Sequence, residues 1–385
     1  MRGMSDLLTA TRRVFRGSSD LAAGVCRLIE RRAREIGQPV KIMNFCGTHE
    51  WTTVHYGLRF LLPPNVRLIA GPGCPVCVTP ASCVDAAIRA AMEGNVVYTF
   101  GDAFRLMGSG SPSSLQEARA AGADVRVIYS FLDAVRDAGS HGRESVFLGI
   151  GFETTAPSYA ILLEAGRVPD NLRIIPACRL TPPSMRHVME FHLERGEIPV
   201  SGVIAPGHVS TVIGAAEWEF LPREYGVPVV VAGFEPLDVL LAVAKILQML
   251  ASGRPGMEIE YRRLVSREGN PMAKRAIAKV FEVSDAVWRG LGRIPASGLL
   301  LREEYREHEL PPGDEGSGGV PDGCRCPDII AGIAVPSDCP LFMRVCRPDR
   351  PLGPCMVSSE GACSIWAREG AGRPSRCAGG FPQGS

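Results

Sequence analysis

The sequence predicts an α/β protein with two Rossmann-like parallel α/β lobes and a mainly helical C-terminal domain that is rich in cysteine. From about residue 20 to 250, short β-branched runs alternate with helical stretches, as in a mostly parallel sheet. Six of the thirteen cysteines then fall between positions 324 and 363, in a stretch rich in Pro and Gly. Such a stretch buries too little apolar surface to fold alone, so we expect a metal or disulfides to cross-link it.

Eight runs are predicted as strands, because each is short, apolar and bounded by turn-forming residues. They span 40–45, 66–70, 96–100, 125–129, 146–150, 172–175, 203–205 and 227–232. After residue 235 the pattern changes. The apolar run at 236–252 predicts a buried helix, and 271–281 predicts an amphipathic helix capped by Asn270.

The α/β part is too long for one typical lobe, so we expect it to divide near residue 123. No internal repeat of fixed period is evident. The expected parts are an N-terminal helix over 1–19 that packs on the C-terminal domain, lobe I over 20–123, lobe II over 124–234, and the C-terminal domain over 235–385.

The composition excludes several classes of protein. The chain has 385 residues, 45% of them apolar and 22% charged, which is ordinary for a globular protein. Its net charge of +1 indicates neither nucleic acid nor a membrane surface as a partner. No transmembrane run or signal peptide is evident. We therefore expect a cytoplasmic protein, where many cysteines indicate metal or redox chemistry more often than structural disulfides.

Four Gly-rich polar loops directly follow predicted strands: CGTHE (46–50), GPGCPVC (71–77), GFETTAPS (151–158) and PGHVS (206–210). Because the carboxyl ends of parallel strands share one edge, we expect the four loops to line one ligand crevice. Helix N-termini at that edge would offer backbone N–H groups to a polar ligand. The chain has no phosphate-binding loop motif, so nucleotide binding is not supported.

Cys46 and His49 are the candidates in the first loop. Cys46 precedes Thr48, the predicted N-cap of the next helix, and a thiol beside a helix N-terminus is biased toward the thiolate. A thiolate binds metals and attacks electrophiles. His49 could ligate, move a proton or hold the thiolate. The alternative for this pair is a buried, inert cysteine with a hydrogen-bonded histidine.

Cys74 and Cys77 form a C-x-x-C motif, which is typical of a dithiol–disulfide couple or of half a zinc site. We favour redox or metal handling, because a zinc site needs a second pair of ligands. The polar side chains of the loops are expected to line the crevice or to meet a partner, although Thr154 and Thr155 could equally cap a helix. These side chains are Thr48, Glu50, Glu153, Thr154, Thr155 and His208.

The six C-terminal cysteines are separated by 1, 12, 6, 8 and 7 residues, with no C-x-x-C pair. Structural zinc favours close pairs, whereas a [4Fe–4S] cluster suits four thiolates at irregular spacing. Four ligands would leave two thiols, enough for one disulfide, and the combination would suit a redox relay. A knot of disulfides alone is the alternative. Cys377 lies in a Gly/Arg/Pro tail and is not expected to be a ligand.

Taken together, CGTHE, GPGCPVC, GFETTAPS, PGHVS, IPASGLLLREEY and PLGPCMVSSEGAC resemble the HypD family of [NiFe]-hydrogenase maturation proteins. The resemblance covers about residues 20–368. It implies two α/β domains and a third domain that carries a [4Fe–4S] cluster. In that family the protein and a small chaperone, HypC, build the Fe(CN)2CO unit of the hydrogenase active site. Cyanide comes from HypE, which carries it as a thiocyanate.

The resemblance also implies roles for individual cysteines. Cys46 would hold the iron of the Fe(CN)2CO unit together with the N-terminal cysteine of HypC. Cys326 and Cys355 would form a redox pair beside the cluster, and electrons would pass on to Cys74 and Cys77. The implied cluster ligands are Cys324, Cys339, Cys346 and Cys363.

His49 would orient a bound group or supply a proton to it. The GFETT and PGHVS loops would shape a docking crevice. Pro327 departs from the family pattern, which usually has Gly after the C-x-C. Three alternatives remain open: an iron–sulfur-dependent thiol–disulfide oxidoreductase, which makes Cys46 dispensable; a non-catalytic iron carrier with a purely structural cluster; and a zinc protein.

Overall fold

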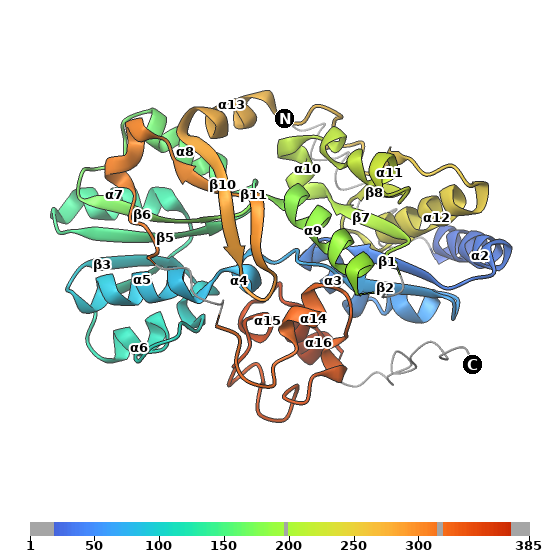
Figure 1. The fold of residues 1–385 in the computed structure, drawn as a ribbon, viewed down its shortest axis with the longest axis horizontal. Helices are drawn as coiled ribbons and strands as arrows, with labels where there is room; N and C mark the ends of the chain where they lie inside the picture. The colour runs from blue at the N-terminus through green and yellow to red at the C-terminus, as the bar shows by residue number, and fades with distance from the viewer. Residues whose placement is uncertain (1–18, 196–198, 314–318, 371–385) are drawn as a thin grey trace. The chain divides into compact units, whose positions relative to one another are not determined.

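The computed structural model describes residues 19–195, 199–313 and 319–370, which form two compact units. Unit 1 combines the residues up to Gly73 with Val188–Gly269 and those from Ile365 onward. Unit 2 combines Cys74–His187 with Asn270–Ser364. Figure 1 follows the chain through both. The helix predicted over 1–19 lies outside the described residues, apart from position 19, and so does Cys377.

Unit 1 contains sheet A, a parallel sheet of five strands in the order β2-β1-β7-β8-β9. Residues of β1, β7 and β8 are buried throughout, which explains why β7 and β8 are continuous apolar runs in the sequence. β1 also contains the buried polar residues Lys41 and Asn44. The strands are β1 (Val40–Asn44), β2 (Val66–Ala70), β7 (Gly202–Pro206), β8 (Val229–Ala232) and β9 (Met257–Ile259).

One apolar cluster joins sheet A to α2 (Ser19–Ile36) and α12 (Pro236–Ser252), which also contact each other. The cluster includes Ile29, Ile42 and Leu247, none of them exposed to solvent. α12 confirms the buried helix predicted over 236–252. The other helical segments of unit 1 are α3 (Gly47–His55), η1 (Leu58–Leu61), α10 (Gly207–Ile213), η3 (Ala215–Trp218) and α11 (Phe220–Glu224).

Unit 2 contains sheet B, a parallel sheet of four strands in the order β4-β3-β5-β6. The strands are β3 (Val96–Phe100), β4 (Val125–Ile128), β5 (Ser145–Gly151) and β6 (Leu172–Cys178). An apolar cluster joins β3, β5 and β6 to α7 (Phe131–His141), α8 (Ala156–Glu164) and α13 (Pro271–Val280). The chain passes between the units within α9 (Thr181–Glu194) and α16 (Ala362–Glu369).

The other helical segments of unit 2 are short, apart from α5. They are α4 (Pro75–Val78), α5 (Ala81–Met92), η2 (Ala103–Arg105), α6 (Leu115–Ala120), η4 (Glu303–His308), α14 (Cys326–Ile330), η5 (Pro336–Asp338) and α15 (Pro354–Val357).

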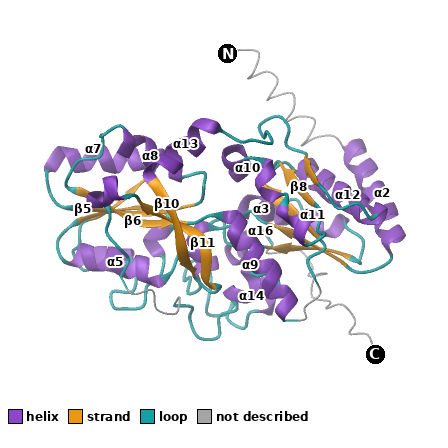
Figure 2. Ribbon diagram, turned by 45° about the horizontal axis from the view of Figure 1, so that its top comes forward, coloured by secondary structure: helices purple, strands orange, loops and turns teal. Residues whose placement is uncertain are grey.

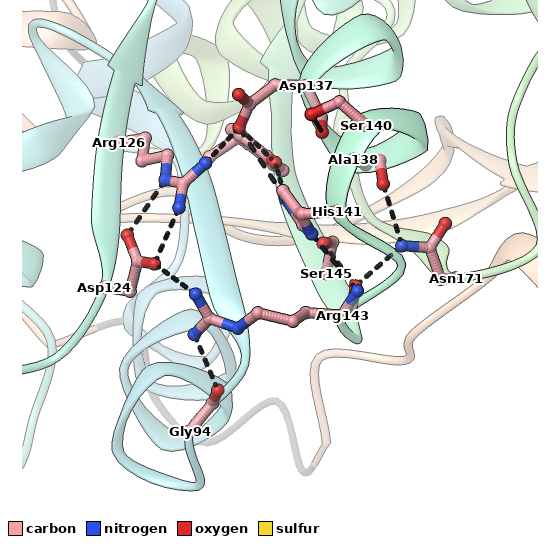
Figure 3. A network of polar contacts seen from close by, with 11 residues as sticks. Gly94, Asp124, Arg126, Asp137, Ala138, Ser140, His141, Arg143, Ser145 and Asn171 are labelled. Atoms are coloured by element: carbon pink, nitrogen blue, oxygen red, sulfur yellow. Dashed lines mark hydrogen bonds and ion pairs between the residues drawn. The ribbon is translucent and has the colours of Figure 1, made fainter.

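Ion pairs hold the amino-terminal edge of sheet B (Figure 3). Arg126 bonds to Asp124, with Nη2 2.8 Å from Oδ2, and also to Asp137. Arg143 links the same Asp124 to the carbonyl of Gly94. The hydrogen bond from Arg126 lowers the pKa of Asp124 to about 2, although partial burial opposes the shift. This edge is opposite the one where strand-end loops form a site, so we interpret the network as structural.

All eight predicted strands are present, but they are grouped differently from lobes I and II. β1 pairs with β2 on one side and with β7, which follows residue 200, on the other. β3, which lies in the predicted lobe I, pairs instead with β4 and β5. The division at residue 123 was therefore wrong. Apolar patterning locates strands, but it does not say which strands pair when the chain leaves one sheet and later returns.

The single C-terminal domain expected over 235–385 is also divided, because α12 and β9 belong to unit 1. In unit 2, α13 confirms the amphipathic helix, and the Asn270 side chain caps it by accepting from the N–H groups of Met272 and Ala273. A hairpin follows in place of the expected helices: β10 (Phe281–Trp288) and β11 (Gly292–Leu301). Figure 2 shows the two strands side by side.

The hairpin was missed because a bulge between Ser284 and Ala286 and polar residues inside β11 interrupt the apolar alternation. Gly290 in its turn and Gly292 at the start of β11 both have left-handed backbone (φ 81° and 83°).

In the described part of the chain, no helix combines the length and apolar character needed to cross a bilayer.

Candidate functional site

Four loops meet at the carboxyl edge of sheet A, because β1, β2, β7 and β8 are parallel and end there. They are the CGTHE loop after β1, the Gly71–Gly73 segment after β2, the PGHVS loop after β7, and the Gly233–Phe234 segment after β8. Three of the predicted loops therefore share one edge of a sheet, as expected. The fourth predicted loop, GFETTAPS, follows β5 and belongs to sheet B, so placing all four at one edge was wrong.

Cys46 is the N-cap residue of α3 and is half-buried. Its backbone is extended (φ −160°, ψ 133°), and its carbonyl accepts the hydrogen bond from the N–H of Glu50. Thr48, predicted as the N-cap, instead lies inside the helix and is half-buried. The thiol is therefore closer to the helix N-terminus than predicted, and the dipole at a helix N-terminus favours a thiolate.

Gly73 allows the loop after β2 to pack directly against Cys46. A Cβ at position 73 would lie 2.5 Å from the backbone nitrogen of Cys46 and 2.6 Å from its Cα. The carbonyl of Gly73 also accepts from the N–H of Gly47 at 3.4 Å. No other residue fits without moving the backbone of Cys46, so Gly73 helps to fix its position.

His49 is fully buried and neutral. Its Nε2 lies 2.9 Å from the carbonyl oxygen of Gly233, a distance at which Nε2–H donates. Its ring stacks on Phe234, with centroids 4.9 Å apart, and His208 also stacks on Phe234 at 3.9 Å. Burial lowers the pKa of His49 to about 4. The surroundings of His208, which is exposed, lower its pKa in the same direction by partial desolvation.

Glu50 is buried at the centre of a polar network in unit 1. Its carboxylate accepts from Arg59 at 2.8 Å, from Asn44 at 2.8 Å and from Nε1 of Trp366 at 2.6 Å. Burial by itself raises the pKa of Glu50, but Arg59 and these hydrogen bonds outweigh it and hold the pKa below its usual value. Glu50 therefore joins α3 to Trp366. The sequence predicts that it lines a crevice or meets a partner, but its side chain is buried and not exposed for such a contact.

A half-buried carboxyl group, that of Glu260, lies beside Gly233. Glu260 accepts from the N–H of Gly233 at 3.2 Å, and Asp238 is paired with Arg263. Burial and the charge of Asp238 raise the pKa of Glu260 to about 7. Sequence reasoning missed this group and Phe234. The run VVVAGFEPLD contains the signal, a glycine directly after a strand, which identified the other loops.

The GFETT loop contributes to packing in unit 2. Glu153 is buried, and its Oε1 accepts from both the backbone N–H of Thr181 at 2.6 Å and the Thr181 hydroxyl at 3.1 Å. It therefore holds the first residue of α9. Thr154 is exposed, and Thr155 is the half-buried N-cap of α8 without a side-chain capping bond.

Cys74 and Cys77 are joined in a disulfide at the start of α4, and both are buried. Cys74 is the N-cap of this one-turn helix, and its Sγ accepts from the N–H of Cys77 at 3.2 Å. α4 contacts α15, which carries Cys355. Cys355 is joined in a second disulfide to Cys326, the first residue of α14. Two disulfides of unit 2 thus lie on elements that contact each other.

The four cysteines that the resemblance implies as cluster ligands lie near one another in unit 2. Burial raises the pKa of Cys324 to about 11, with further contributions from Cys339 and Cys346, and burial and the other three thiols raise the pKa of Cys363 well above 9. Cys346 Sγ accepts from the N–H groups of Leu352 and Gly353 at 3.4 and 3.5 Å. A Cβ at Gly353 would lie 2.8 Å from Cys324 Sγ.

This donor set fits a [4Fe–4S] cluster, because it combines four neighbouring thiols, a close backbone approach and N–H groups aimed at sulfur. In the residues that the structure describes, no three His, Cys, Asp or Glu side chains converge on one metal ion.

Comparison with known proteins identifies the family. The HypD model, described as "Hydrogenase formation hypA family", matches residues 20–370. The hydrogenase maturation factor HypD of Cupriavidus necator is 43% identical over 355 residues, which are 90% of this chain and 93% of the relative. HypD2 of Bradyrhizobium diazoefficiens has the same identity and coverage. HypD of Rhodobacter capsulatus is 41% identical over 92% of this chain and 96% of the relative. The family match and the similar relatives agree, and the chain belongs to the HypD family of hydrogenase maturation factors.

Proposed function

We propose that this chain is the scaffold on which the Fe(CN)2CO unit of a [NiFe]-hydrogenase is assembled. Iron, the cargo, is held between Cys46 and the N-terminal cysteine of a small HypC-type chaperone. Cyanide is delivered by a HypE-type partner. The observation that carries this proposal is the position of Cys46, a half-buried cysteine at the N-cap position of α3, at the carboxyl edge of sheet A.

The surroundings of Cys46 support iron binding by its sulfur. Low-spin iron with cyanide and carbonyl ligands prefers soft thiolate donors. The N-terminus of α3 favours the thiolate, and the backbone of Gly73 packs against the cysteine and restricts its movement. His49 is neutral at pH 7 and donates a hydrogen bond to the carbonyl of Gly233. This supports a role in orienting neighbouring groups rather than a role as a proton donor.

The redox part of the proposal rests on the cysteines of unit 2. A [4Fe–4S] cluster held by Cys324, Cys339, Cys346 and Cys363 would supply single electrons. Two electrons and two protons convert the Cys326–Cys355 disulfide into two thiols. One of these, as the thiolate, attacks the Cys74–Cys77 disulfide, and the other resolves the mixed disulfide. The contact between α4 and α15 supports this exchange.

Infrared spectroscopy of the complex tests the scaffold. The chain is co-purified without oxygen with the HypC-type and HypE-type partners, and we expect bands from cyanide and carbonyl stretching. These bands should be lost in Cys46→Ser. Cys26→Ser is the matched control, because Cys26 is also a half-buried thiol of unit 1, and it should keep the bands. Unchanged bands in Cys46→Ser would contradict the scaffold.

An iron–sulfur-dependent thiol–disulfide oxidoreductase is the second candidate, favoured by the two disulfides on contacting elements. It predicts turnover of a protein disulfide and leaves Cys46 without a role. Full hydrogenase maturation by Cys46→Ala, together with loss of maturation in Cys74→Ser, would favour this function over the scaffold.

A further inference from the structure

Arg289 is a buried cation at the C-terminal end of the helix that carries Cys74 and Cys77. It lies in the turn between β10 and β11 and is 1% exposed. Its backbone N–H donates to the carbonyl of Val78 at 2.7 Å, and its Nε donates to the carbonyl of Thr79 at 2.6 Å. These carbonyls belong to the last residue of α4 and to its C-cap, so the guanidinium group covers the end of the helix.

The other guanidinium nitrogens also bond to the backbone. Nη2 donates to Met107 at 2.8 Å and Nη1 to Gly319 at 3.2 Å. Within the described ranges, the hydrogen bonds of Arg289 all end on carbonyl oxygens, and the ionisable groups that act on it electrostatically are Cys83 and Asp85. Burial lowers the pKa of Arg289 to about 10, which leaves it protonated at neutral pH.

One helical turn separates the bonds of Arg289 from the two cysteines. α4 is a single turn, so about 7 Å along its axis separates Cys74 from the carbonyl of Thr79, and Cys77 is nearer. Both sulfurs are buried, so salt and water screen the charge weakly. When the disulfide is reduced, a cation in this position stabilises a thiolate. The N–H of Cys77, 3.2 Å from Cys74 Sγ, favours Cys74 as the thiolate.

We propose that Arg289 is a positioning residue that sets the reduction potential of the Cys74–Cys77 couple through its positive charge. The inference rests on the redox role proposed above. In the reaction, the S–S bond between Cys74 and Cys77 breaks, and a reduced dithiol supplies two electrons and two protons and becomes a disulfide. Because the guanidinium group stabilises the reduced product, it makes the couple more oxidising.

The test is a redox titration of the full chain in mixtures of reduced and oxidised dithiothreitol without oxygen. Free thiols are trapped by alkylation, and mass spectrometry of the peptide that contains Cys74 and Cys77 gives their oxidised fraction. Arg289→Gln removes the charge, and we expect it to shift the equilibrium constant about tenfold toward the disulfide, or about 30 mV for two electrons. Arg289→Lys keeps the charge and should stay near the wild-type midpoint.

Arg179→Gln is the matched control. Arg179 is also buried, bonds to backbone carbonyls and contacts the same hairpin through Val287, but it does not bond to α4. Its midpoint should remain that of the wild type. A midpoint that Arg289→Gln leaves unmoved, or that Lys and Gln shift equally, overturns the inference and leaves Arg289 with packing alone.

The same titration separates this inference from the function on which it rests. If wild-type Cys74 and Cys77 never become a dithiol in any mixture, the proposed redox role fails and the inference fails with it. If the wild-type couple cycles and only the Arg289→Gln shift is missing, the redox role stands. Should Arg289→Gln not fold, Arg289→Met also removes the charge while it keeps an extended side chain. A shift of about tenfold toward the disulfide in Arg289→Met would support the inference, and a wild-type midpoint there would overturn it.

Discussion

At the scale of single residues, burial decides what each polar side chain can do. Glu50 and Glu153 were candidates for contact with a partner, but both are buried and hydrogen-bonded to their own unit. Cys46 remains half-exposed because it is at the start of its helix rather than within it. Within the short motif CGTHE, Cys46 is thus half-exposed, whereas His49 and Glu50 are buried and bond to other parts of unit 1.

The buried ring of His49 predicts a specific dependence of stability on pH. Burial lowers its pKa from 6.5 to about 4 in the folded state. Between these pH values the unfolded chain binds the extra proton, so the free energy of unfolding falls as the pH falls, by up to about 3 kcal/mol. His49→Gln keeps a donor for Gly233 but does not titrate, and it should lose this part of the pH dependence.

Denaturant unfolding of both proteins at pH 7.5 and pH 5 measures the effect. Glu260 acts in the opposite direction, because burial raises its pKa to about 7 and its contribution to stability is lost as the pH rises through that value. The difference between wild type and variant therefore isolates His49. An equal fall in stability for the two proteins would show that His49 does not titrate as a buried group.

At the scale of elements, glycines decide how closely the strand-end loops approach one another. Gly73 lets the loop after β2 reach the backbone of Cys46, and Gly233 brings the loop after β8 beside Asp238 and Tyr261. Neither contact depends on a positive φ. Both depend on the missing side chain, and they allow several loops to share one edge of sheet A.

Gly73→Ala should displace the turn that contains Cys46. Its Cβ would lie 2.5 Å from a backbone atom, which cannot rotate away, so we expect a loss of about 1–3 kcal/mol of unfolding free energy. Gly139→Ala is the control, because a Cβ at this exposed position of α7 meets nothing within 4 Å. It should be neutral or stabilising by up to about 1 kcal/mol. Equal denaturation midpoints for the two variants would contradict this account of Gly73.

At the scale of the whole molecule, each unit is assembled from separate parts of the chain. Sheet A uses strands from both sides of sheet B in sequence, and the cysteine-rich segment folds with unit 2, whereas the residues from Ile365 onward return to unit 1. The cysteine-rich segment itself has little regular structure, with α14 and α15 only 5 and 4 residues long. A cluster and a disulfide would supply the cross-links that such a segment needs.

Iron content tests the cluster. Wild type reconstituted without oxygen should bind about four iron and four sulfide per chain and turn brown. Cys339→Ser should lose most of this iron and unfold the cysteine-rich segment. The double variant Cys326→Ser, Cys355→Ser is the control, because it removes two cysteines of the same segment that lie in the disulfide, and it should keep the iron. A colourless protein that contains zinc would contradict the cluster and favour the zinc alternative.

The sequence by itself determined the local elements and the family of this protein. Strands are recognisable because β-branched runs are intrinsically short and apolar, and α12 and the Asn270 cap follow from local patterning. The motifs that carry the resemblance are local in the same sense. The bulged hairpin is not predicted from the sequence, because its apolar pattern is weak within each strand. The pattern is strong only when residues paired across the two strands are considered together.

Only the tertiary structure decided which strands share a sheet, that GFETT is absent from the edge that presents Cys46, and that Arg289 covers the helix of Cys74 and Cys77. The physical reason is that strand pairing and charge burial join residues far apart in sequence. Arg289 and Thr79, for example, are 210 positions apart. Local patterns report whether a segment is apolar, but not which distant segment will cover it.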